Sequence, residues 1–171
     1  MHRLMWLLPR NASSAVVVLL SVSGCAGSVV GQRPLSERES YIIGAVGHAW
    51  EALEGAPLPV KAAGRLASIG VVEATCVQAE ELCLYPCDRL ASCAVWTDGP
   101  AVVINVSHAR YEPGHWHDTA ILHESLHFLA GALDPYGWPD TYHEIQTFWP
   151  GQTENNVYSI VSGDLETYGA H

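Results

Sequence analysis

The residues with the clearest capacity for chemistry are His123, Glu124 and His127, which form an H-E-x-x-H sequence inside an apolar segment. Histidines four residues apart lie on one face of a helix, one turn above the other. Two neutral imidazole nitrogens placed in this way can bind one tetrahedral metal ion, and the intervening glutamate stands beside that ion as a candidate base. We therefore expect a Zn²⁺ site with His123 and His127 as ligands and Glu124 as general base.

The surroundings of this motif favour a buried site over a surface helix. Residues 118–131 contain no Lys or Arg, whereas a solvated helix carries charges along its outer face. Buried imidazole and carboxyl groups need partners, because unpaired polar groups are costly to bury, and a metal ion in a cleft would satisfy them. Gly131 stands where the helix is expected to end. The alternative is a pair of ordinary buried histidines.

The first 24 residues have the order of an export signal. Arg3 and Arg10 precede the short apolar core of residues 15–20, and small residues follow. That core is too short to span a bilayer as a helix. The run Val22-Ser23-Gly24-Cys25 resembles a bacterial lipobox, in which the cysteine is lipidated and becomes the new N-terminus. The alternative is a plain secretory cleavage near Ala26.

The lipobox resemblance places the protein in the cell envelope, anchored to a membrane through its N-terminal lipid. Ala26 follows the cysteine where an aspartate would favour the inner membrane, so the resemblance implies the outer membrane, facing the periplasm, in a Gram-negative host. The expected organisation is a signal peptide at residues 1–24, the lipidated Cys25 and a tether at residues 25–36, and one domain at residues 37–171.

The remaining cysteines form an even set within eighteen residues. In an exported protein such a set is expected to be oxidised to two disulfides, with three possible connectivities. The competing interpretation is a zinc site built from four thiolates, but the spacings are not paired C-x-x-C repeats. The four residues are Cys76, Cys83, Cys87 and Cys93.

The length and charge of the chain limit the remaining choices. Without residues 1–24, the chain has 147 residues, which is enough for one domain with a hydrophobic core. This part has six basic residues against eighteen acidic ones. The acidic excess argues against nucleic acid or anionic lipid as a partner of the protein surface.

Helical patterns precede the motif. Ser36 and Glu39 form a capping-box pair, and apolar residues then recur at helical spacing, so residues 37–54 are expected to form an amphipathic helix. Residues 60–68 are expected to form a second, short helix.

Three short apolar runs separated by turn signals predict strands. The last two flank Thr97-Asp98-Gly99-Pro100, which is a hairpin signal. The expected fold is α+β, with a small antiparallel sheet packed on the motif helix, an N-terminal amphipathic helix and a disulfide-rich loop. The expected strands are residues 71–77, 94–96 and 101–106, and the loop is residues 78–93.

Beyond the motif, a turn-rich loop at residues 134–140 leads to His143, sixteen residues after His127. Tyr136, Tyr142 and Tyr158 are candidate hydrogen-bond donors to a tetrahedral intermediate. Asp134 and Asp140 are candidates for orienting ligand imidazoles, although capping of the loop is the commoner role. Trp138 and Trp149 are expected to pack. The pattern of residues 155–171 is ambiguous.

This layout of a helix, a small sheet and an H-E-x-x-H helix resembles the zincin metallopeptidases over about residues 37–150. The longer metzincin pattern is out of register, because position 130 is Ala and position 133 is Leu. The pattern with a distant glutamate ligand is poorly met, because Glu144 and Glu154 follow the motif too soon.

The chain is more similar to small uncharacterised bacterial zinc peptidases. In these, H-E-x-x-H is followed by a glycine, a loop that contains an aspartate, and a single histidine. His123, Glu124, His127, Gly131, Asp140 and His143 fit that outline. The resemblance implies His123, His127 and His143 as the metal ligands, with a fourth position open to water, as in a catalytic rather than a structural zinc site.

The resemblance implies zinc-dependent hydrolysis of peptide bonds in a peptide or protein substrate, with Glu124 as general base on the zinc-bound water. By analogy to the fold, the strand at residues 101–106 would run along the cleft and pair with an extended peptide. Two alternatives remain: an amidase or endopeptidase that acts on peptidoglycan, and a non-catalytic envelope lipoprotein that binds metal.

Overall fold

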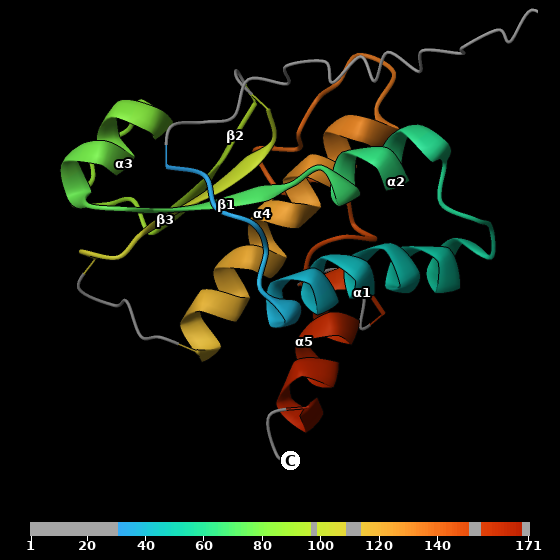
Figure 1. The fold of residues 1–171 in the computed structure, drawn as a ribbon. Helices are drawn as coiled ribbons and strands as arrows, with labels where there is room; N and C mark the ends of the chain where they lie inside the picture. Colours follow the sequence, from blue (N-terminus) through green and yellow to red (C-terminus); the bar gives the residue numbers. More distant parts are fainter. Residues whose placement is uncertain (1–30, 97–98, 109–113, 151–154, 169–171) are drawn as a thin grey trace, which may run out of the picture.

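The computed structural model describes residues 31–96, 99–108, 114–150 and 155–168, and it has the α+β organisation that the sequence predicts (Figure 1). The expected signal peptide and Cys25 lie outside these residues. Within them no helix is both long enough and apolar enough to cross a membrane. The elements are α1 (Glu37–Glu54), α2 (Val60–Ala67), β1 (Gly70–Ala74), α3 (Cys76–Cys83), β2 (Ser92–Val95), β3 (Ala101–Asn105), α4 (His115–Leu133) and α5 (Val157–Tyr168).

The first helix has the bounds that its capping signals predict. The Ser36 hydroxyl accepts a hydrogen bond from the Glu39 N–H at 3.2 Å, and the Glu39 carboxylate accepts one from the Ser36 N–H at 2.7 Å. These two bonds satisfy backbone donors that the first turn of a helix leaves unpaired. The helix ends at Gly55, whose φ of 65° places it in the left-handed region that glycine adopts without steric cost.

The sheet is mixed, so the expectation of an antiparallel sheet is wrong. Its strand order is β1-β3-β2, with β3 parallel to β1 and antiparallel to β2. Parallel neighbours need a long crossover, and here α3, its following loop and β2 supply it. The antiparallel pairing of β2 with β3 agrees with the hairpin signal, although Thr97 and Asp98 lie outside the described residues.

The central strand is β3, and this position excludes it as a peptide-binding edge. All five of its residues are buried, and both of its edges are paired. The expectation that the strand at residues 101–106 pairs with a substrate is therefore wrong. One outer strand, β1, forms an isolated antiparallel backbone bridge between Val71 and Arg33. The other, β2, lies beside α4.

The two faces of the sheet contact different layers. Val71, Val102 and Ile104 belong to the main core, together with α1, α2, α4 and α5. Val72 and Val103 belong to a smaller cluster that α3 covers. Figure 1 shows α3 on the side of the sheet opposite α1 and α4. A five-residue strand buried on both faces needs apolar residues at every position, which explains the continuous run in β3.

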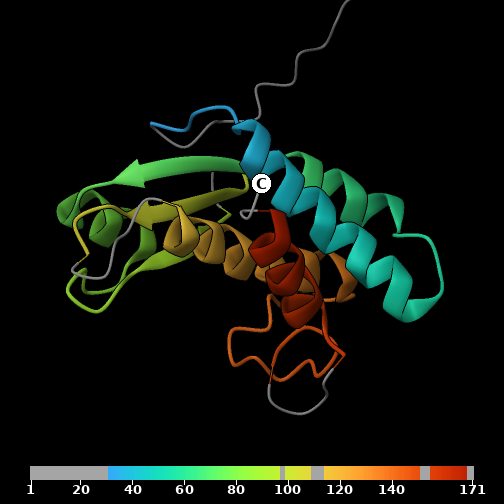
Figure 2. The same cartoon turned by 90° about the horizontal axis from the view of Figure 1, so that it is seen from below.

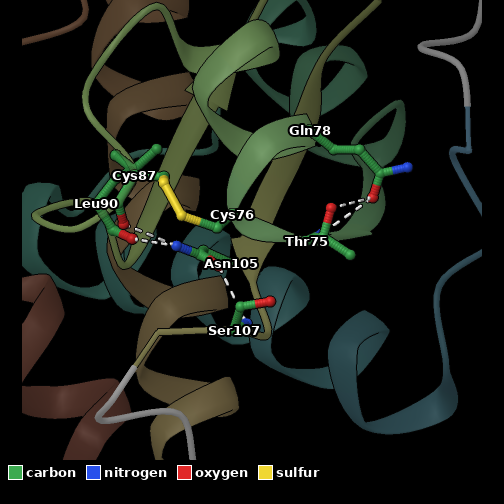
Figure 3. The surroundings of a disulfide bond; sticks show 7 residues. All are labelled: Thr75, Cys76, Gln78, Cys87, Leu90, Asn105 and Ser107. Carbon is green, nitrogen blue, oxygen red and sulfur yellow. Dashed lines mark hydrogen bonds between the residues drawn. A yellow bond between two sulfur atoms is a disulfide. The ribbon is translucent and has the colours of Figure 1, made fainter.

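Two disulfides cross-link the layer that contains α3, and they confirm the expected oxidation of the four cysteines. Cys76 pairs with Cys87, and Cys83 pairs with Cys93. Figure 3 shows Asn105 beside the first of these bonds, where its Nδ2 donates to the carbonyls of Cys87 and Leu90 at 3.0 and 2.9 Å. The paired sulfurs leave no thiolates for the alternative zinc site.

Two further local differences from the expected elements are helices. The expected cysteine-rich loop begins with the helix α3, whose N-cap Thr75 forms a capping box with Gln78. The ambiguous C-terminal segment forms α5, which packs on α1 and α4 and buries Val157 and Val161.

A buried ion cluster joins the segment before α1 to α1 and α4. The Glu39 carboxylate, 2% exposed, accepts hydrogen bonds at 2.7 Å from both terminal nitrogens of Arg33 and from the His117 Nε2. Burial raises the pKa of Glu39, but the hydrogen bonds from Arg33, Ser36 and His117 outweigh this effect and hold the pKa at about 2.

We expect Glu39 to make the stability of the fold depend on pH in acid. Its folded pKa lies below its unfolded value of 4.5, so its contribution is complete above that value and is lost as the pH falls through about 2. Glu39→Gln should lower the free energy of unfolding at neutral pH by about 2 kcal/mol. It should also flatten the acid limb of the stability profile, which is the loss of unfolding free energy as the pH falls below 4.5. Urea unfolding across the pH range measures both effects.

The matched control is Glu37→Gln, which changes an exposed carboxylate in the same helical turn. It should retain nearly all of the stability and the full acid limb. An unchanged acid limb in Glu39→Gln would show that other carboxylates cause it.

Candidate metal centre

The helix α4 carries the motif and is buried along most of its length. It packs against α1, α2, α5, β2 and β3, and all residues from Glu124 to Ala132 are buried. It ends at Leu133, two residues beyond the expected end at Gly131. Gly131 is needed instead for close packing, since a Cβ there would lie 2.9 Å from the Trp96 ring and 3.3 Å from the Gly137 carbonyl oxygen.

Three histidines bring their ring nitrogens together at the side of this helix. The Nε2 of His127 lies 3.3 Å from that of His123 and 3.4 Å from that of His143, and all three residues offer ligand atoms within 4.8 Å of one another. Tetrahedral coordination with metal–nitrogen bonds of 2.0–2.1 Å places ligand nitrogens about 3.3 to 3.4 Å apart. The three side chains therefore lie close enough to bind one metal ion.

A backbone carbonyl fixes the tautomer of the central ligand. The His127 Nδ1 lies 2.8 Å from the Pro139 carbonyl oxygen, which can only accept a hydrogen bond. The proton of neutral His127 is therefore on Nδ1, and the Nε2 lone pair faces His123 and His143. This orientation is the one that metal-binding histidines adopt, so the donor set fits a metal ion.

Electrostatics favour neutral, metal-competent imidazoles. Burial lowers the pKa of His123 to about 4, with a further contribution from the neighbouring His127 and His143. Burial also lowers the pKa of His127. Neutral nitrogens at neutral pH offer lone pairs to a metal without first losing a proton.

The third histidine is presented by a loop that Asp140 organises (Figure 2, the orange segment after α4). Asp140 is fully buried, and its carboxylate accepts hydrogen bonds from the N–H groups of Glu144 at 2.8 Å and Ile145 at 3.0 Å. Both Asp140 and His143 have positive φ, at 52° and 57°, a conformation that non-glycine residues rarely adopt. Asp140 therefore has the expected capping role and positions His143 indirectly.

Trp149 forms the wall behind the three histidines. Its ring centroid lies 5.0 Å from those of His123 and His127 and 4.1 Å from that of His143. Its Nε1 donates a hydrogen bond to Asp140 at 2.6 Å. Trp149 is buried, in line with the expectation that it packs, and it excludes water from one side of the cluster.

Glu124 is buried next to the cluster without joining it. Its carboxylate accepts a hydrogen bond from the Ser92 hydroxyl of β2 at 2.6 Å, and the Ala94 N–H also faces it. Burial raises the pKa of Glu124 to about 7, although both donors act in the opposite direction. The convergent ligand atoms are those of the three histidines, and Glu124 is not one of them.

These residues line two adjoining cavities beside β2, here together called the edge groove. Its larger part, the histidine arm, has a volume of about 620 Å³ and includes all three histidines. Its smaller part, the arginine arm, has a volume of about 350 Å³ and includes Arg89. Leu90, Ser92, His123 and Glu124 line both arms.

The other residues singled out from the sequence lie away from the edge groove. Tyr136 and Tyr142 are exposed, and Tyr158 is half-buried on α5, where burial raises its pKa. Asp134 accepts hydrogen bonds from the N–H groups of Tyr136 and Trp138 and so caps the loop after α4. None of these tyrosines lines either arm.

Sequence reasoning missed two partners of the motif. Ser92 gives no signal of its own, since a serine at the start of a strand is common and its contact with Glu124 spans 32 positions. The Pro139 contact uses a backbone carbonyl, which every residue has. Comparison of the chain with protein-family models, curated proteins and solved structures found no match.

We expect removal of the His143 imidazole to abolish tight metal binding. His143→Asn suits the test because asparagine tolerates the left-handed backbone of this position. Loss of an outer partner of a ligand typically costs about 10- to 100-fold in metal affinity, so loss of a direct ligand should cost more. Competition with a chromogenic chelator measures the affinity.

The matched control is His48→Asn, which removes an exposed histidine on α1 that pairs with Glu51 and should leave the affinity unchanged. Glu144→Ala removes the neighbouring carboxylate and should also retain the metal. Tight binding in His143→Asn together with its loss in Glu144→Ala would show that the ligand is Glu144.

Proposed function

We propose that this protein is an exported, lipid-anchored, zinc-dependent peptidase that hydrolyses peptide bonds. The observation that carries the proposal is the placement of three convergent imidazoles and a buried carboxylate in one groove. The resemblance of the motif and its downstream histidine to the zincin peptidases agrees with this placement.

Zinc is the metal that suits this donor set best among those common in hydrolases. Three histidines with a fourth position open to water form a known catalytic zinc site, and imidazole also accepts copper, iron and nickel. When bound, a zinc ion would supply Lewis acidity for the substrate carbonyl and lower the pKa of a coordinated water.

Glu124 would carry the proton during hydrolysis. Its carboxylate accepts a proton from the attacking water and then delivers that proton to the leaving amine nitrogen. Ser92 holds one carboxylate oxygen at 2.6 Å, so the side chain is oriented before substrate arrives. Binding of metal alone does not need a carboxylate here, and burial of this group raises its pKa to about 7. The energetic cost of burying this carboxylate favours an enzyme over a non-catalytic metal-binding lipoprotein.

The outer edge of β2 would hold the substrate in an extended conformation. The Asn105 N–H donates to the Ala91 carbonyl at 3.0 Å, so alternate residues of β2 direct their backbone groups towards β3. Ser92 and Ala94 then direct theirs outward, along the edge groove. Because the Ala94 N–H already faces Glu124, the Ser92 backbone and the Ala94 carbonyl are the groups left for a substrate. A peptide that adds to this edge passes Glu124 and His123. The same geometry accepts a peptide of peptidoglycan, which the envelope location makes accessible.

We expect Glu124→Gln to retain zinc and lose turnover. The amide keeps the shape and still accepts the Ser92 hydrogen bond, but it cannot take a proton. General acid–base catalysis is typically worth about 10² to 10⁴ in rate, so kcat on a peptide library should fall by at least that factor while zinc content stays near one equivalent. The control Glu144→Gln changes an exposed glutamate and should keep its rate. Full activity in Glu124→Gln would eliminate this mechanism.

We expect the mature protein to begin with an acylated Cys25. This proposal rests on the lipobox-like run of residues 22–25. Mass spectrometry of the protein extracted from membranes should detect the lipid on the N-terminal cysteine, and Cys25→Ser should move the protein to the soluble fraction. A soluble wild-type protein that begins at Ala26 would rule the anchor out.

A further inference from the structure

The arginine arm of the edge groove contains a cation, Arg89, that forms no ion pair with the described residues. Among the described residues, Arg33 pairs with Glu39 and Glu73, Arg38 pairs with Asp118, and Arg65 lies over the Trp96 ring. Lys61 and Arg89 have no ion-pair partner in that part of the chain. Both are exposed, but Lys61 lies on α2, whereas Arg89 lines the groove together with Ser92, His123 and Glu124.

Several contacts hold the backbone around Arg89, although the loop is exposed. The buried side chain of Asn105 donates to the carbonyls of Cys87 and Leu90, on either side of Arg89. The Arg89 N–H donates to the Pro86 carbonyl at 3.2 Å, and Cys87 is tied to α3 through its disulfide with Cys76. Figure 3 shows Asn105 reaching both carbonyls. These contacts fix the backbone position from which the Arg89 side chain extends.

The charge and the lining of the arm indicate what it would hold. The chain has a formal net charge of −10, so most of its ionised groups are acidic, and Arg89 is a cation in the groove that pairs with no described carboxylate. The other walls of the arm include Leu90, Trp116 and Ala120, which provide apolar surface. A guanidinium next to apolar surface matches a carboxylate joined to a short aliphatic or peptide stem, since arginine binds carboxylates through two parallel hydrogen bonds.

We propose that Arg89 binds a carboxylate of the substrate and makes the enzyme selective for acidic peptides. The carboxylate is an Asp or Glu side chain near the scissile bond or the free C-terminus of the peptide. This inference rests on the proposed peptidase function, because it places the scissile bond at Glu124 and His123, which line the same arm.

The first experiment compares kcat/KM on matched peptides with the zinc-loaded mature protein. One peptide is neutral and amidated, one carries a glutamate in place of glutamine, and one has a free C-terminal carboxylate. A hydrogen-bonded charge pair corresponds to about 10- to 100-fold in affinity. The wild type should prefer an acidic peptide by that factor, Arg89→Gln should lose the preference, and Arg89→Glu should reverse it towards a lysine peptide.

The matched control is Lys61→Gln, which removes the other unpaired cation outside the groove and should keep both rate and preference. Selectivity for the internal glutamate identifies an endopeptidase that reads an acidic side chain, and selectivity for the free C-terminus identifies a carboxypeptidase. A wild type that cleaves neutral and acidic peptides equally overturns the inference and leaves the peptidase proposal standing.

The second experiment measures binding of the same fluorescently labelled peptides by anisotropy to the metal-free protein, where no metal can attract the carboxylate. Acidic peptides should bind at least about 10-fold more tightly than the neutral one, and the difference should vanish in Arg89→Gln and weaken with salt. Arg89-dependent binding without any cleavage by the zinc-loaded protein supports the carboxylate site and overturns the peptidase proposal. Equal binding of all peptides overturns the carboxylate site.

Discussion

The burial of α4 is the constraint on which the rest of the structure depends. A helix that packs against three other helices and two strands has little access to water along its buried face, so most of its buried polar side chains are paired with groups of other segments. Ser125 is the exception, since its buried Oγ has no hydrogen-bond partner among the described residues. Asp118 is paired by Arg38, His117 by Glu39, and Glu124 by Ser92. The loop after the helix supplies the partner of His127 at Pro139. The contacts of Glu124 with Ser92 and of His127 with Pro139 therefore both satisfy the helix and shape the site.

Features with a local signal could be predicted from the sequence. The bounds of α1 follow from a capping box and a left-handed glycine, and the motif helix follows from its apolar flanks. The convergence of His143 with His123 and His127 is confirmed as a cluster able to bind a metal ion, since few histidines follow the motif. The oxidation of four cysteines follows from their even number, but their pairing depends on where α3 places Cys76 and Cys83.

Features decided by distant contacts could not be predicted. The parallel pairing of β1 with β3 joins segments about thirty residues apart, and apolar alternation is the same for either strand direction. The helix α4 is longer than expected, because Gly131 allows the close packing of Trp96 and does not end the helix. Ser92 acquires its role only because β2 lies beside α4. In each case the deciding interaction lies outside any short window of sequence.

The position of Glu124 against β2 has a consequence for self-association. A three-stranded sheet exposes two edges, and an unpaired edge is a template on which another copy of the chain can add a strand and aggregate. Arg33 covers the edge of β1. At the edge of β2, the carboxylate of Glu124 faces the Ala94 N–H, so this N–H is not offered to a second chain, and only a strand that pairs through the remaining backbone groups of Ser92 and Ala94 can add there. The residue at the centre of the groove thereby also protects the sheet from indiscriminate strand addition.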